Sequence, residues 1–266
     1  MLQPYHCTAA STMIPCTSIP FRSYEESIPE ICDLIGAGEV FARQDTILIK
    51  PNLINDSPPP VTTPVQACRA LVEYIRSWTD CRLIIAEGCG DPGLETMDVF
   101  HALGYTRLGS ELKVDLLDLN QEPATTQSKA SCRLLPEAAL PRIALEAFIV
   151  SVPVLKAHSL ATITGTLKNM LGFAPPDTYG GRKGSWKKAF FHQRMQTALQ
   201  EWNAYITPDM TIMDGSVGLA EYHLGGPPCS PPLKTLLAGF DPYAVDRRGA
   251  ELLGFDPATI QHLRPL

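Results

Sequence analysis

Short apolar runs alternate along the chain with longer amphipathic segments, and glycine, proline or polar residues bound each run. This pattern predicts buried strands joined by helices. We expect strands at 46–50, 82–86, 114–119, 147–152, 210–213 and 233–238. We expect helices at 24–37, from 64 onward, at 94–103, after 162–166, at 187–203 and at 242–253. The alternation predicts the α/β class, with a largely parallel open sheet flanked by helices.

Helix start signals sharpen some of these boundaries. Ser23 and Glu26 have the spacing of a capping box. Thr63 is expected as an N-cap with Pro64 as the first helical residue, and Asp241 is expected to cap the last helix. Pro153 cannot donate to a sheet ladder, so we expect the strand at 147–152 to end there.

Two long loops rich in glycine and proline, around 175–186 and 217–232, interrupt the pattern. We interpret them as lids or insertions in a single domain spanning 1–266. The segment 179–186 combines three glycines with Arg182 and Lys183, and we expect it to be mobile until an anion binds. The alternative is that Trp186 already fixes it to the core.

Polar side chains follow the strands at the points where these end. Because ligands of open α/β sheets bind outside the carboxyl ends of the strands, we expect one shared cleft. Its basic residues favour a ligand that carries a carboxylate or phosphate group. The candidate ligand-binding residues are Lys50, Asn52, Thr63, Glu87, Lys168, Asn169, Arg182, Lys183 and Asp241.

The acid–base candidates are Lys156, His158 and Asp214. Because Lys156 disfavours a second positive charge nearby, a neutral His158 could serve as a general base, with Asp214 and Glu87 as alternatives. Cys89 stands among carboxylates, which raise a thiol pKa, so we expect it to be inert or regulatory. We assign no metal site, although one hypothetical set of oxygen and nitrogen ligands comprises Asp214, Asp241, Asp246 and His223.

Composition excludes several classes of protein. The formal net charge of -6 argues against general nucleic-acid binding. We found no apolar stretch of membrane-spanning length, no secretory signal, no P-loop and no dinucleotide-binding fingerprint, and we expect a cytoplasmic protein. The eight cysteines form no Cys-x-x-Cys pair, so an intrinsic cluster is not expected.

Several motifs in order resemble those of the DUF362 family. They are Pro153-x-Leu155-Lys156-x-His158, Thr164-Gly165-x-Leu167-Lys168-Asn169-Met170-x-Gly172, and the segments 47–53, 62–64, 213–215 and 241–246. The resemblance implies little about activity, because the general function of the family is not settled. Many members resemble iron–sulfur proteins through a fused ferredoxin-like segment, which we do not expect in this chain.

Two hypotheses of function remain open. In the first, the chain is an enzyme acting on a small anionic metabolite by acid–base or redox chemistry, and its cofactor is not assigned. In the second, it is a non-catalytic or redox accessory protein that works with an iron–sulfur partner, as the resemblance implies.

Overall fold

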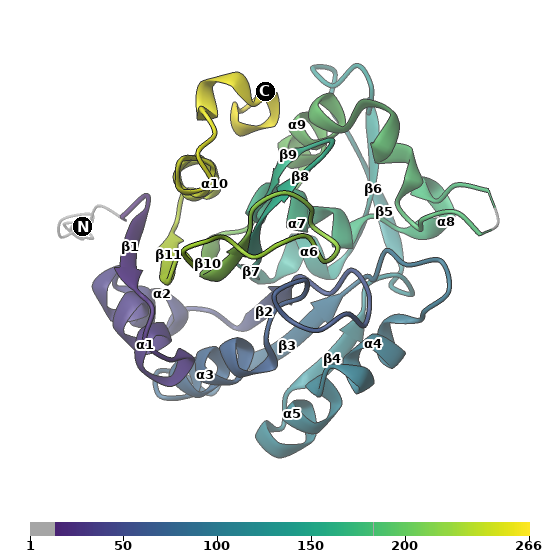
Figure 1. The fold of residues 1–266 in the computed structure, drawn as a ribbon. Coiled ribbons are helices and arrows are strands. Elements are labelled where there is room, and N and C mark those ends of the chain that lie inside the picture. The colour runs from purple at the N-terminus through teal and green to yellow at the C-terminus, as the bar shows by residue number, and fades with distance from the viewer. Residues whose placement is uncertain (1–13, 183) are drawn as a thin grey trace, which may run out of the picture.

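The structure is a computed structural model that describes residues 14–182 and 184–266. Over these residues a nine-stranded sheet lies between layers of helices, and a two-stranded hairpin stands apart (Figure 1). The strands are β1 Thr17–Pro20, β2 Thr46–Pro51, β3 Arg82–Glu87, β4 Asp115–Asp118, β5 Ala124–Ser128, β6 Glu137–Pro141, β7 Phe148–Val152, β8 Val154–His158, β9 Thr162–Thr164, β10 Met210–Leu219 and β11 Thr235–Gly239. The helices are α1 Tyr24–Leu34, α2 Ala37–Phe41, α3 Val65–Arg76, α4 Thr96–Ala102, α5 Tyr105–Leu112, α6 Ile143–Glu146, α7 Thr166–Asn169, α8 Pro176–Tyr179, α9 Met195–Tyr205 and α10 Pro242–Leu252.

The main sheet has the strand order β1-β11-β10-β7-β2-β3-β4. The strands from β10 to β4 are parallel, which confirms the expected largely parallel α/β sheet. The expectation that all the principal strands open on one side is wrong for β11, which is antiparallel to both β1 and β10. Asp241, which follows β11, therefore lies at the edge opposite to the carboxyl ends of β2, β3 and β7.

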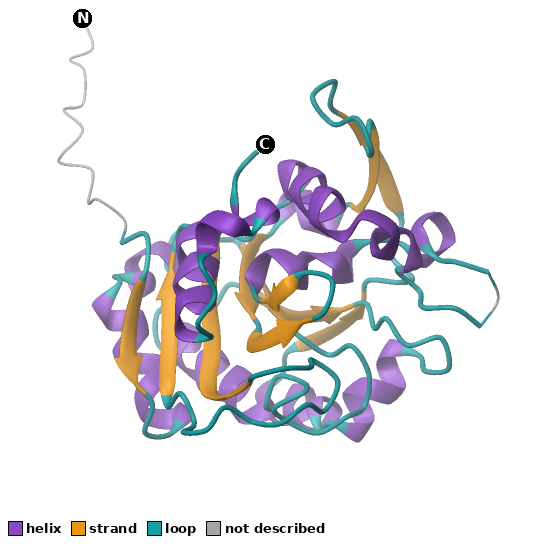
Figure 2. Ribbon diagram, turned by 45° about the horizontal axis from the view of Figure 1, so that its top comes forward, coloured by secondary structure: helices purple, strands orange, loops and turns teal. Residues whose placement is uncertain are grey.

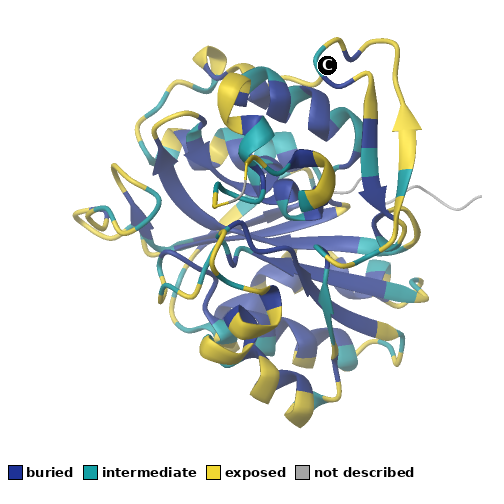
Figure 3. Cartoon of the chain, turned by 90° about the vertical axis from the view of Figure 1, so that its right-hand side faces the viewer, coloured by how far each residue is buried: buried dark blue, intermediate teal, exposed yellow. Residues whose placement is uncertain are grey.

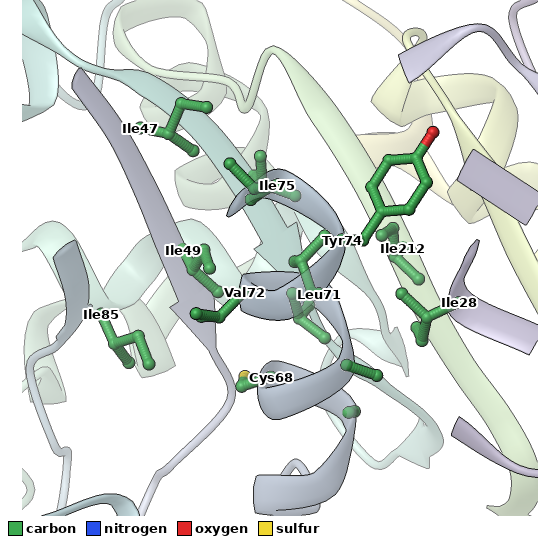
Figure 4. Packing of buried hydrophobic residues seen from close by; sticks show 14 of the residues in the cluster. Ile28, Ile47, Ile49, Cys68, Leu71, Val72, Tyr74, Ile75, Ile85 and Ile212 are labelled. Carbon is green, nitrogen blue, oxygen red and sulfur yellow. The ribbon is translucent and has the colours of Figure 1, made fainter. Parts of the chain in front are cut away.

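Side chains of alternate positions enter two separate cores, one on each face of the sheet. Ile47 and Ile49 of β2 pack with α1 and α3, whereas Leu48 packs on the other face with α9. Figure 4 shows the first core, where Leu71 and Val72 of α3 lie against β2. Burial on both faces explains why these strands are continuous apolar runs in the sequence.

The strand expected at 147–152 ends before Pro153, as expected, and a further strand begins directly after it. β7 stops at Val152, β8 begins at Val154, and both pair in parallel with β10. Pro153 donates nothing but accepts the Asp214 amide through its carbonyl at 2.8 Å. Lys156 and His158 are consequently held in β8 rather than in a loop, and β8 forms a hairpin with β9.

The helix boundaries confirm some sequence signals and correct others. Ser23 caps α1 by accepting the Glu26 amide, and Asp241 caps α10. Thr63 is not the N-cap of α3, because its hydroxyl donates to the Val152 carbonyl at 2.7 Å and the helix starts at Val65. The expected helix at 187–203 is a 3₁₀ segment, Ala189–Arg194, followed by α9.

The hairpin of β5 and β6 is the most exposed strand pair. It rises beyond the main sheet, and β5 is mostly exposed whereas the central strands β2, β3, β7 and β8 of the main sheet are mostly buried (Figures 2 and 3). Its position agrees with the polar composition of the surrounding sequence. Among the helices of the described residues, none is both long and apolar enough to cross a membrane.

Candidate functional site

The carboxyl ends of β2 and β3 place a lysine and a glutamate in contact. Lys50 Nζ lies 2.6 Å from Glu87 Oε1, and the two side chains are 1% and 4% exposed. Glu87 also accepts the backbone amides of Leu53 and Gly88 at 2.7 and 2.8 Å. Such additional hydrogen bonds are what make a buried ion pair tolerable, because each ion loses its hydration. The pair joins the two strand ends.

Asn169, at the end of α7, connects this ion pair to β7. Its Oδ1 accepts Lys50 Nζ at 3.2 Å, and its Nδ2 donates to the Lys50 carbonyl and to Ser151 Oγ at 2.9 and 3.0 Å. Every polar atom of the Asn169 amide group therefore has a partner although the side chain is buried. This explains why an asparagine follows Lys168 in the motif.

Two glycines of the motif 164–172, Gly165 and Gly172, leave space for neighbouring carboxylate groups. A Cβ atom at Gly172 would overlap Glu87 Oε1 and Lys50 Cε, and one at Gly165 would overlap the carboxylate of Asp246. Asp246, which reaches over from α10, accepts the amides of Thr166 and Leu167 at 2.7 and 2.9 Å. Burial raises the pKa of Asp246 to about 7, although these two amides oppose the shift. Distant motifs of the sequence are thus direct neighbours in space.

Lys156 is buried and lies behind the residues described above. Its Nζ donates to Asn52 Oδ1 and to the Val61 carbonyl at 2.7 and 2.6 Å, and the residue is 1% exposed. Asn52 is positioned in turn by Thr63, whose Oγ1 accepts the Asn52 amide at 2.8 Å. Burial, together with the neighbouring charge of Lys168, lowers the pKa of Lys156 to about 7. Lys156 and Thr63 therefore hold Asn52 in place through hydrogen bonds.

Two adjacent chambers, which share four lining residues, lie beside the ion pair of Lys50 and Glu87. The inner chamber has a volume of about 60 Å³ and the outer about 280 Å³. Ile54, Lys168, Trp186 and His192 line both of them. The inner chamber is further lined by Lys50, Asn52, Glu87, Asn169 and Lys188, and the outer by His158, Leu160, Tyr222, His223 and Leu224.

The inner chamber has an excess of positive charge. Three lysines line it, Lys50, Lys168 and Lys188, against the single carboxylate of Glu87, which is already paired. Burial lowers the pKa of Lys168 to about 8 and that of Lys188 to about 7. Lys188 Nζ donates to Asn120 Oδ1 at 2.5 Å and to the Ala174 carbonyl. Lys168 Nζ makes no ion pair or hydrogen bond with any other described residue, so its charge is available to a ligand.

Two imidazoles form the wall of the outer chamber. The rings of His158 and His223 stack with centroids 3.8 Å apart and an interplanar angle of 20°. His158 Nδ1 accepts the amides of Leu160 and Ala161 at 3.0 and 3.2 Å, so the proton of the neutral ring is on Nε2. Burial, reinforced by the charge of Lys168, lowers the pKa to about 2 for His158 and about 3 for His223. His158 is thus a neutral hydrogen-bond donor and a weak proton acceptor.

The structure brings together five of the residues expected from the sequence: Lys50, Asn52, Glu87, Lys168 and Asn169 line the inner chamber. Asp214 lines neither chamber. It lies within β10, accepts the Tyr24 hydroxyl at 2.7 Å, and has a pKa raised by burial. Asp241 caps α10 at the other edge of the sheet, and exposed Arg182 also lines neither chamber. Lys183 lies outside the described residues.

The C-terminal part of the 179–186 loop is tied to the glycine turn after β3. The Lys187 amide donates to the Gly90 carbonyl at 2.9 Å, and Lys187 Nζ donates to the Leu94 carbonyl at 2.5 Å. Cys89 is buried in this turn, and burial raises the pKa of its thiol. Mobility of the loop tip stays a prediction.

No group of three or more His, Cys, Asp and Glu side chains capable of holding a metal ion occurs within 14–182 and 184–266. Asp214, Asp241, Asp246 and His223 in particular do not form such a group. The first is held by Tyr24, the second caps α10, and the third receives the amides at the start of α7.

Sequence reasoning did not assign Trp186, Lys188, His192 and His223 to the cleft. Lys188 lies just after the segment 179–186, for which only mobility was expected. His223 comes from the long loop after β10, whose path no local pattern predicts. The one available signal was the shared content of the two glycine-rich loops, which both carry aromatic and basic residues.

Comparisons with known proteins agree with this architecture. The apoprotein structure of lactate racemase from Thermoanaerobacterium thermosaccharolyticum has a similar fold, with a TM-score of 0.50 and 15% identity over 92% of this chain. The present chain spans 58% of the length of that racemase. A thylakoid-associated protein of Synechocystis sp. is 26% identical over 237 residues, which cover 85% of this chain and 68% of the relative. The family model described as "Domain of unknown function (DUF362)" matches residues 47–251, and the chain therefore belongs to the DUF362 family.

Proposed function

We propose that this chain is an enzyme that binds a small carboxylate or phosphate metabolite in the two-chamber cleft and acts on it by proton transfer. The observation that carries the proposal is the charge of the inner chamber. In a protein of formal net charge -6, three lysines converge there against one carboxylate that is already paired. A ligand with negative charge would restore the balance.

The side chains of Lys168, His158 and Lys188 would each have a different role in this reaction. Lys168 lines both chambers and would bind the anionic group. His158 would donate from Nε2–H to an oxygen of the substrate, as a neutral imidazole can when its conjugate acid is disfavoured. Lys188 would accept the proton, because a neutral amine keeps two N–H groups for Asn120 and Ala174 and has one lone pair left.

Deuterium exchange tests the proton-transfer step without knowledge of the product. The protein is incubated in D₂O with acetate, lactate, glycolate and pyruvate, and loss of the C–H signals is followed by proton NMR. We expect exchange with at least one probe. Lys188→Met should reduce its rate at least 100-fold, and Arg182→Met, a change in an exposed cation outside both chambers, should leave it unchanged.

Binding must be measured beside exchange, so that the two parts of the proposal are separated. If a probe binds in a manner that depends on Lys168 and no exchange occurs, the proton-transfer role is wrong and anion binding stands. If exchange is as fast in Lys188→Met as in the wild type, another group accepts the proton.

A further inference from the structure

The two chambers differ in chemistry as well as in size. The inner volume of about 60 Å³ holds a few atoms at most, because one water needs about 10–15 Å³ on the same measure. Its polar lining comprises three ammonium groups, two side-chain amides, the carboxylate of Glu87 and the imidazole of His192, beside Ile54, Leu171 and Trp186. The outer volume of about 280 Å³ is more than four times larger, and Lys168 stands at the junction.

The outer chamber presents flat, uncharged rings. The stacked imidazoles of His158 and His223 are neutral at physiological pH, and Tyr222 packs edge-on against His223 with centroids 4.9 Å apart. Trp186 and Ile54 complete the wall on the side shared with the inner chamber. No carboxylate lines this chamber among the described residues.

Apolar side chains are exposed at its mouth. Tyr222 is 45% exposed and Leu160 is 48% exposed. Both line the outer chamber, so a group bound there would bury them. Ligand pockets typically combine such apolar and aromatic walls with a few polar groups that fix orientation.

We infer that the ligand is a small anion that carries a flat aromatic or heteroaromatic group. The anionic head lies beside Lys168 in the inner chamber, and the ring lies along the wall formed by His158, His223 and Tyr222. This inference rests on the proposed anion binding and adds the class of the ligand. Aromatic groups gain from edge-to-face and offset-stacked contacts that an aliphatic group of equal size does not make.

Three carboxylates of equal charge test the inference by calorimetry at pH 7.5: acetate, cyclohexanecarboxylate and benzoate. We expect benzoate to bind at least ten-fold more tightly than acetate and at least three-fold more tightly than cyclohexanecarboxylate. Methyl phosphate and phenyl phosphate repeat the comparison with the other head group. The head group that binds more tightly identifies the natural one.

Variants of one residue from each chamber separate the two contributions. Tyr222→Ala should remove most of the advantage of benzoate and leave the affinity for acetate within two-fold, whereas Lys168→Met should weaken both. If benzoate binds no better than acetate while both depend on Lys168, the aromatic group is wrong and anion binding stands. If none of the five anions binds, the proposed function falls, and this inference falls with it.

Discussion

Replacing Glu87 by Gln removes the negative charge of the buried pair at the end of β3. Glu87 accepts three hydrogen bonds, from Lys50, Leu53 and Gly88, and glutamine offers one accepting oxygen in place of two. Its NH₂ group therefore faces a donor, and the Lys50 ammonium is left buried without its counter-charge. Removing one partner of a buried pair costs about 3–5 kcal/mol of the free energy of unfolding.

Urea denaturation measures this loss. Asp115→Asn is the matched control, because Asp115 forms an ion pair with Arg82 at the start of β3, where both side chains are at least 60% exposed. It should cost less than about 1 kcal/mol. Adding Lys50→Met to Glu87→Gln should recover at least about 1 kcal/mol by removing the unpaired charge. If Glu87→Gln costs no more than Asp115→Asn, the buried pair does not join the strands as described.

Two further predictions concern neighbouring residues. Gly165→Ala should lower the free energy of unfolding by about 1–3 kcal/mol in urea denaturation, because the added methyl group overlaps Asp246; equal stability would contradict the described contact. Burial raises the pKa of Asp246, so its contribution to stability is fully present below about pH 4 and is lost as the pH rises to about 7. The advantage of the wild type over Asp246→Asn should therefore shrink over that range, and a constant difference would refute the shift. In nitrogen NMR spectra, His158 should keep its proton on Nε2 between pH 5 and 8, whereas titration in that range would make it the general base expected from the sequence.

The parallel part of the fold was predictable because its strands are buried on both faces. Runs such as 46–50 and 82–86 are mostly apolar, and the helix α3 separates them. The direction of β11 was not predictable. The connection of residues 220–234 between β10 and β11 has no helix, and its length permits either direction of the following strand. Asp241 was assigned to the cleft for this reason.

The sequence predicted only some of the residues at the polar centre of the site. Lys50, Glu87 and Asn169 were selected because they follow apolar strands or open a helix, and they do meet. Their mutual contacts depend on strand order, which puts β7 beside β2. The strand β8, which begins directly after Pro153, was not expected, and it forms because the neighbouring β10 is long enough to pair with it. Such non-local pairing leaves no signal in a local pattern.

The roles of the basic residues depended on burial, which the sequence does not contain. Arg182 and Lys188 belong to one basic segment, yet the first is exposed and the second is buried against Asn120. Likewise Lys156 and Lys168, which belong to two consecutive motifs, differ in access to the cleft.

The most direct test of anion binding at Lys168 is the affinity for sulfate, which does not titrate between pH 6 and 10, measured by calorimetry across that range. A bound anion raises the pKa of Lys168, which burial lowers to about 8 in the free protein. The affinity should therefore fall as the pH rises through 7 and 8, with proton uptake on binding that Lys168 shares with Lys188, whose pKa burial lowers to about 7. Lys168→Met should reduce the proton uptake near pH 8 and weaken binding at least ten-fold, whereas Arg182→Met should change neither. An affinity that is independent of pH and unchanged in Lys168→Met would contradict the account.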